Sequence, residues 1–175
     1  MSLRHLTLFA IGLTSVFLFA GCRSSRANTP RAPQVSRTAM DVLIQEGDVS
    51  DMQTQQYKYR QELRAYMERD LPRRFSRYGF DVKILRQLSE HQSAEGRYLL
   101  TIHYDAYNPG SAAARYTVGF GAGAASLDLS ATLQKNSAAE LSWKDGCGTS
   151  GHWSRIVNKL DDNMAKKLRE FFSKR

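Results

Sequence analysis

The stretch Tyr98-Leu-Leu-Thr-Ile-His-Tyr-Asp105 decides the fold class, because its side chains alternate in character along the chain. One series of large apolar side chains occupies every second position, and the side chains between them are more polar. The first series comprises Tyr98, Leu100, Ile102 and Tyr104, and the second comprises Leu99, Thr101, His103 and Asp105. A period of two predicts a half-buried β-strand. The turn-forming residues Asn108-Pro-Gly110 then end it.

The same alternation predicts further strands on both sides of this one. It recurs over Phe80–Ile84 and over Ser126–Gln134, and Leu141 and Trp143 continue it after a turn at 135–138. A turn is also expected at 91–96. Each strand carries one polar face, which is typical of antiparallel pairing with one side open to solvent. Val42-Leu43-Ile44 is either a short strand or a docking segment.

Two helices are expected, one on each side of these strands in the chain. In residues 52–78 the apolar side chains step by three and four. They are Tyr59, Leu63, Tyr66, Met67, Leu71 and Phe75. Pro72 removes a backbone hydrogen bond, so we expect a kink or break there, with Asp70 as a cap, and Gly79 as the helix end.

A second helical period runs from Trp153 to the end of the chain. Its apolar positions are Ile156, Val157, Leu160, Met164, Leu168, Phe171 and Phe172. The element order therefore predicts an α+β domain over residues 41–175. In this domain an antiparallel sheet of about four strands packs against an N-terminal and a C-terminal helix.

The N-terminus has the pattern of a secretory signal. Arg4 and His5 precede an apolar run at 6–20, and Gly21 and Cys22 follow. The run is shorter than the roughly 20 residues that a membrane-spanning helix needs. The ending Leu18-Phe-Ala-Gly-Cys22 resembles the bacterial lipobox, with Phe19 where leucine is usual.

This resemblance implies that the signal, residues 1–21, is cut between Gly21 and Cys22. Cys22 would then carry diacylglycerol on its thiol and an acyl chain such as palmitate on its new amine. The alternative is cleavage at Ala20 or Gly21 with Cys22 incidental. No Asp follows Cys22, so the outer membrane, with the domain facing the periplasm, is favoured over the inner one. No other cofactor is expected.

Residues 22–40 are expected to form a disordered basic tether. They contain Arg23, Arg26, Arg31 and Arg37 and no acidic residue. These side chains either bind anionic headgroups or are solvated. The whole chain has a formal charge of +8. An exported protein without an aromatic-interleaved basic groove is not expected to bind nucleic acid.

The segment between the two strand pairs is rich in glycine and resembles a known family signature. Its positions are Gly110, Ser111, Arg115, Tyr116, Gly119, Phe120, Gly121, Ala122 and Gly123. These residues are similar to the signature of a family of bacterial lipoproteins, the domain of unknown function 4410. The resemblance implies an envelope lipoprotein and brings no established activity.

The glycine segment is open to two interpretations. Its glycines could supply the backbone freedom that a loop entering the sheet requires. Alternatively, the segment is an interaction loop that lets another chain or lipid approach closely, since Gly119 and Gly123 have small-xxx-small spacing. A phosphate-binding loop is not expected, because the spacing differs and a strand follows instead of a helix.

Cys147 is the remaining cysteine and is the candidate nucleophile for a hydrolase. His103 or His152 would have to act as its base. Cys147 and His152 alone cannot complete a zinc site, so no metal site is expected. No motif of cysteine hydrolases is present, and we expect no catalytic residue. Cys147 is either buried or available to pair between chains.

Two functions remain after these considerations. The first is a non-enzymatic envelope lipoprotein that binds a protein or glycan partner or supports an assembly, and a homo-oligomer is compatible with it. It would use the glycine segment and a basic helix face formed by Arg60, Arg64 and Arg73. The alternative is an envelope hydrolase with Cys147 as the nucleophile.

Overall fold

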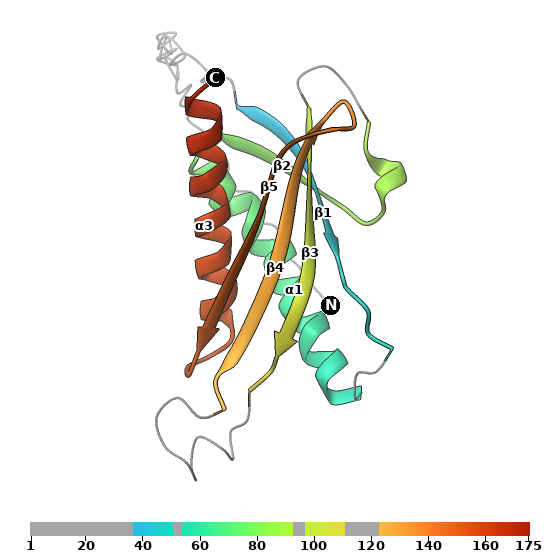
Figure 1. The fold of residues 1–175 in the computed structure, drawn as a ribbon, viewed down its shortest axis with the longest axis vertical. Helices are drawn as coiled ribbons and strands as arrows, with labels where there is room; N and C mark the ends of the chain where they lie inside the picture. The colour runs from blue at the N-terminus through green and yellow to red at the C-terminus, as the bar shows by residue number, and fades with distance from the viewer. Residues whose placement is uncertain (1–36, 51–53, 93–96, 111–122) are drawn as a thin grey trace, which may run out of the picture. The chain divides into compact units, whose positions relative to one another are not determined.

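The computed structural model describes residues 37–50, 54–92, 97–110 and 123–175, all within one compact unit that spans residues 35–175. Five strands, two long helices and a short 3₁₀ helix make up the described part (Figure 1). In chain order they are β1 (Thr38–Gln45), α1 (Thr54–Ser76), β2 (Phe80–Leu85), η1 (Leu88–Glu90), β3 (Tyr98–Asn108), β4 (Ala125–Lys135), β5 (Ala138–Thr149) and α3 (Ser154–Ser173).

The sheet has five strands in the order β2-β1-β3-β4-β5 and is mixed. β1 is parallel to both of its neighbours, β2 and β3, whereas β3, β4 and β5 form an antiparallel meander. The prediction of about four antiparallel strands is therefore correct only in part, because the sheet has five strands and β1 pairs in parallel with β2 and β3. The α+β class with two flanking helices is confirmed.

β1 is an interior strand of the sheet, and both of its faces are buried. Met40, Val42 and Ile44 point into the main core, and Leu43 lies in a second small cluster with Leu85 and Leu99 on the other face. A strand covered on both sides lacks the polar alternation that marks a half-buried one. Val42–Ile44 is thus a strand, and not a docking segment.

Two different connections cover the two faces beside β1. From β1 to β2 the chain passes through α1, which packs on the face that carries the main core. From β2 to β3 it passes along the opposite face, where the His91 ring bonds Asp41 of β1, with Nδ1 and Oδ2 2.9 Å apart. Arg97 also binds the Asp41 carboxylate. Leu43, Leu85 and Leu99 form the small buried cluster on this face.

α1 runs without interruption through Pro72, so the expected break does not occur. Leu71 and Phe75 on either side of the proline are fully buried, and Asp70 bonds Arg74 across it. These contacts offset the roughly 3 kcal/mol that a proline costs in a helix interior. The helix ends at Ser76, three residues before the predicted end at Gly79, and Gly79, with φ of 90°, ends the turn that follows.

The remaining strands and α3 follow the sequence patterns. The side chains of β4 alternate, and its odd positions from Leu127 to Leu133 are buried. Asn136 and Ser137 have φ of 49° and 66°, which suits the tight turn that joins β4 to β5. α3 packs against α1 and β5 and buries Ile156, Val157, Leu160, Met164 and Leu168.

Candidate functional site

The three arginines predicted to form one basic face lie in different environments. Arg60 is only 2% exposed, so it lies inside the domain and does not belong to a solvent-facing surface. Arg64 is half-buried, and Arg73 is largely exposed. The helix period explains this: Arg60 falls on the apolar stripe with Leu63 and Met67, three and seven residues further on.

Arg60 donates a hydrogen bond to the backbone of β3 just beyond the point where the neighbouring strand β1 ends. β1 pairs with β3 as far as Gln45 opposite His103, and the next carbonyl, of Tyr104, accepts a hydrogen bond from Nη2 of Arg60 at 3.2 Å. The guanidinium also lies 5.5 Å from the centroid of the Tyr104 ring. A Cβ on Gly47 would lie 2.6 Å from the same carbonyl oxygen, so the chain after β1 packs tightly here.

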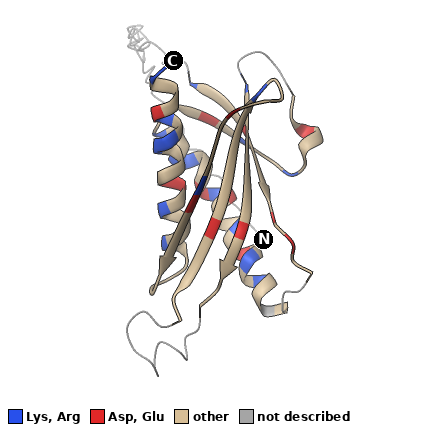
Figure 2. Ribbon diagram, in the orientation of Figure 1, with Lys and Arg blue, Asp and Glu red and all other residues tan. Residues whose placement is uncertain are grey.

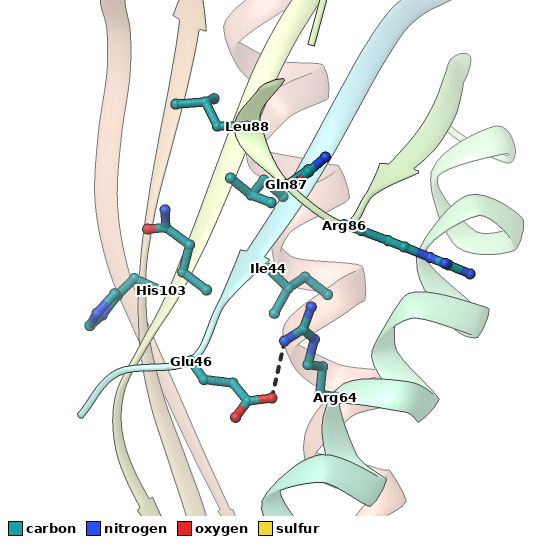
Figure 3. Close-up of a pocket in the computed structure, with 9 residues that line it drawn as sticks. Ile44, Glu46, Arg64, Arg86, Gln87, Leu88 and His103 are labelled. Carbon is teal, nitrogen blue, oxygen red and sulfur yellow. Dashed lines mark hydrogen bonds and ion pairs between the residues drawn. The ribbon is translucent and has the colours of Figure 1, made fainter. Parts of the chain in front are cut away.

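Arg64 helps to line a groove at the carboxyl end of β1 (Figure 3). Its guanidinium bonds Glu68 at 2.8 Å and Glu46 at 3.1 Å, and the second contact ties α1 to the end of β1. Arg86 and His103 also line the groove, which has a volume of about 410 Å³. Since Arg64 already has two carboxylate partners, its charge is compensated within the domain.

Arg73 and Arg74 share the carboxylate of Asp70 at the interface of α1 and α3. Nη2 of Arg73 lies 2.6 Å from Asp70 Oδ1, and Arg74 bonds Asp70 as well as Asp162, the latter at 3.0 Å. Arg74 also donates to Oδ1 of Asn158 at 2.6 Å. Burial works to raise the pKa of Asp70, but the two guanidinium groups lower it below its usual value.

Asp161 of α3 lies beside this network and was not anticipated from the sequence. Its side chain is 0% exposed, and neither carboxylate oxygen has a hydrogen-bond donor among the described residues. Burial, and then the negative charge of Asp70, raise the pKa of Asp161 well above the ordinary value. A protonated Asp161 can donate a hydrogen bond to Asp70, and the pair then carries a single negative charge, which Arg73 and Arg74 face.

We expect the exposed Arg73–Asp70 pair to contribute little to stability. The Arg73 side chain is 64% exposed, and Arg74 keeps Asp70 paired when Arg73 is removed. Arg73→Ala should lower the free energy of unfolding by less than about 1 kcal/mol, measured by urea denaturation. Arg77→Ala, at an exposed position just after the helix, is the control, and a loss above about 2 kcal/mol for Arg73 would contradict this assignment.

The ends of the glycine segment are described, and they lie against each other. Gly110 and Gly123 have φ of 74° and 71°. A Cβ on Gly110 would collide with the Gly123 carbonyl oxygen and lie 2.8 Å from the Ala125 nitrogen. These two glycines therefore serve the backbone at the base of the segment, as the structural interpretation requires. Ser111, Arg115, Tyr116, Gly119, Phe120 and Gly121 lie outside the described residues.

A small pocket adjoins this base. It has a volume of about 340 Å³ and lies between the base and the turn that leads into α3. Pro109 and Ala125 line one side, and His152 and Trp153 line the other. The His152 ring stacks at 4.9 Å from the Trp153 ring, and its Nδ1 bonds the Ser154 hydroxyl at 2.8 Å.

The geometry separates Cys147 from one of its two candidate bases. Cys147 pairs with Leu127 in the β4–β5 ladder and packs against the main core, so it faces the helices. His103 lies opposite Ser130 on the other face of the sheet and bonds Asp105 at 3.1 Å. The Cys147 thiol itself donates to the Gly148 carbonyl at 3.6 Å. No group of three or more metal-ligating side chains occurs among the described residues.

The domain of unknown function (DUF4410) matches residues 29–152. The chain belongs to this family. The resemblance seen in the glycine segment is thereby confirmed, and the match covers all five strands, α1 and η1 and ends before α3. No curated protein gave a significant match.

Solved structures with the same fold share little sequence with this member of the DUF4410 family. The PelC dodecamer from Paraburkholderia phytofirmans is 13% identical, with a TM-score of 0.54, and the match covers 77% of this chain and 89% of PelC. Protein XCC0632 from Xanthomonas campestris, of the DUF330 family, is also 13% identical, with a TM-score of 0.52 and coverage of 83% and 90%. At this identity the likeness concerns the fold.

Within the described part of the chain, no helix is both long enough and apolar enough to cross a membrane.

Proposed function

We propose that the protein is a lipid-anchored lipoprotein of the bacterial cell envelope, with a domain that acts as a non-enzymatic binding or assembly module. The observation that carries this proposal is the Leu18–Cys22 ending after a basic and apolar leader. Two or more acyl chains on Cys22 would anchor the protein durably, whereas one would not. The tether before β1 would then connect the anchor to the folded domain.

Self-association is the assembly role that we favour for this domain. PelC, which has the same fold, forms a dodecamer. The described side chains of this chain offer structural networks and shallow pockets, and Cys147 and His103 face away from each other across the sheet. These features support an assembly module over a hydrolase built on Cys147.

Metabolic labelling with a palmitate analogue in a bacterial host tests the anchoring. Wild-type protein should be labelled and should fractionate with the outer membrane, and Cys22→Ser should lose the label. Cys147→Ser is the matched control, because it removes the chain's only other cysteine and should leave labelling unchanged. A mass spectrum of the mature N-terminus with an unmodified Cys22 thiol would overturn the proposal.

A further inference from the structure

Four cationic side chains from different elements lie at the end of the domain at which β1 begins. We propose that this end, formed by Arg37, Arg77, Lys135 and Lys174 and here called the basic end, binds the anionic headgroups of the membrane that holds the lipid anchor. This inference rests on the proposed function, because the chain that leads from the lipid anchor on Cys22 would reach the domain at Arg37.

Strand register and ring contacts place these side chains at one end. Thr38 lies opposite Phe80, and its backbone NH donates to the Gly79 carbonyl at 3.0 Å, so Arg37 and Arg77 lie on either side of this contact. The Phe172 ring of α3 contacts Phe80 at 5.7 Å and Tyr98 at 4.8 Å between centroids. The end of α3, and with it Lys174, therefore reaches the same place.

Lys135 completes the group from the turn between β4 and β5. Its Nζ lies 5.1 Å from the centroid of the Tyr98 ring, at the start of β3. Figure 2 shows Lys and Arg along α3 and towards the C-terminus at this end of the domain. The basic end thus draws on the beginning of β1, the end of α1, the β4–β5 turn and the end of α3.

The charges of the basic end are not compensated within the described part of the domain. None of its four cations forms an ion pair there, whereas the neighbouring Arg97 and Arg175 are paired with Asp41 and Glu140. Arg37, Arg77 and Lys174 are exposed. Uncompensated and exposed cations are available to an external anion, and three of the four meet both conditions.

Acidic side chains lie at both ends of the strands: Asp81, Glu140 and Glu170 lie at the basic end, and three others lie towards the opposite end. Asp48 follows β1, Asp105 lies near the end of β3, and Asp128 lies near the start of β4. Asp105 and Asp128 are exposed. An anionic surface would attract the unpaired cations of the basic end and repel the exposed carboxylates at the opposite end.

The tether adds to the same attraction. Arg23, Arg26 and Arg31 lie between Cys22 and the domain, with no acidic residue among them. Lipid chains combined with a basic patch are a recognised pair of membrane signals, and each cation near an anionic leaflet strengthens binding. A membrane is favoured over a soluble polyanion because the chain would reach the basic end directly from its anchor.

Binding of residues 23–175 without lipid to vesicles tests this inference. This part contains every described element and the whole buried core, from Met40 to Leu168, so it carries the complete domain. We expect it to bind vesicles with 30% phosphatidylglycerol, to dissociate from them at high salt, and not to bind vesicles of pure phosphatidylcholine. Cosedimentation gives the partition coefficient.

Charge-matched triple variants distinguish the basic end from net charge. Arg37→Gln, Arg77→Gln and Lys174→Gln together should weaken binding by about 100-fold, since each cation near the surface contributes about fivefold. Lys58→Gln, Lys144→Gln and Arg155→Gln remove three exposed cations elsewhere and should weaken it by less than about tenfold. Circular dichroism should show both variants to be folded.

Three results would overturn the inference. They are equal weakening by the two triple variants, equal binding to neutral vesicles, and binding to a soluble polyanion such as heparin without binding to vesicles. Because these experiments omit the lipid, their failure leaves lipidation of Cys22 untouched. Conversely, if Cys22 is not labelled, the vesicle experiment still shows whether the basic end binds anionic lipid.

Discussion

Asp161→Asn should stabilise the protein at neutral pH by about 1 kcal/mol or more, because it removes a buried acid that ionises more easily in the unfolded chain. Asp161 is fully buried, and burial followed by the charge of Asp70 raises its pKa in the folded state. An asparagine amide has nearly the same shape, can donate to Asp70 as the protonated acid can, and carries no charge at any pH.

The pH dependence of this effect identifies its cause. Below the ordinary pKa of about 3.8 both folded and unfolded states hold the Asp161 proton, so the group costs nothing there. Above that pH the unfolded chain releases the proton first, and stability contributed by this group falls until the pH passes the raised folded-state pKa. The gain from Asp161→Asn should therefore be absent near pH 3 and should grow as pH rises.

Urea denaturation of wild type and variant over this pH range measures the difference. Asp70 has the opposite pH dependence: its lowered pKa stabilises the fold at pH values above the ordinary pKa of an aspartate, and this stabilisation is lost as the pH falls. This contribution is present in both curves and cancels in their difference. Asp162→Asn is the control, since this neighbour is 40% exposed and pairs with Arg74. A gain that is constant with pH, or a loss at pH 7, would show that Asp161 is ionised or bonded in the fold.

Arg60→Ala should lower the free energy of unfolding by about 2–4 kcal/mol. The substitution leaves the Tyr104 carbonyl without its described side-chain donor, and a buried unsatisfied group of this kind costs about 1–3 kcal/mol. It also removes the guanidinium that lies over the Tyr104 ring and the buried aliphatic stem that carries it. Both losses occur at the point where the β1–β3 ladder ends.

A second substitution separates these two contributions. Arg60→Met keeps most of the apolar stem and loses the guanidinium, so its stability should lie between wild type and Arg60→Ala. Urea denaturation midpoints and slopes provide the measurement. If Arg60→Met is as stable as wild type, the hydrogen bond to Tyr104 contributes nothing net. If Arg60→Ala changes the free energy of unfolding by less than about 1 kcal/mol, the Arg60 side chain does not stabilise the end of the β1–β3 ladder.

The sequence patterns predicted the elements well and their pairing poorly. The alternation in 98–105 and 126–134 and the helical period after Trp153 correspond to β3, β4 and α3. Strand direction depends on contacts between distant segments, and β1 carries no alternation because side chains on both of its faces are buried. Local periodicity therefore could not reveal that the sheet is mixed.

The buried charges could have been found with the same helical period. Arg60 precedes Leu63 by three residues, and Asp161 lies three residues before Met164, so both occupy the apolar stripe of their helices. Treating every charged residue of a helix as solvent-facing placed Arg60 on the wrong surface. The partners of such residues, Tyr104 and Asp70, come from other elements and only the folded chain brings them into contact.

The central place of β1 also determines how the domain responds to mechanical load. Tension on the segment before Thr38 acts along the length of a strand that is bonded on both sides, opposite Phe80–Leu85 and opposite Tyr98–His103. Force along a strand shears its two ladders together, whereas an edge strand pulled from one end would peel off one bond at a time. A domain held at the envelope through this segment is thus attached by a strand that has hydrogen-bonded neighbours on both sides.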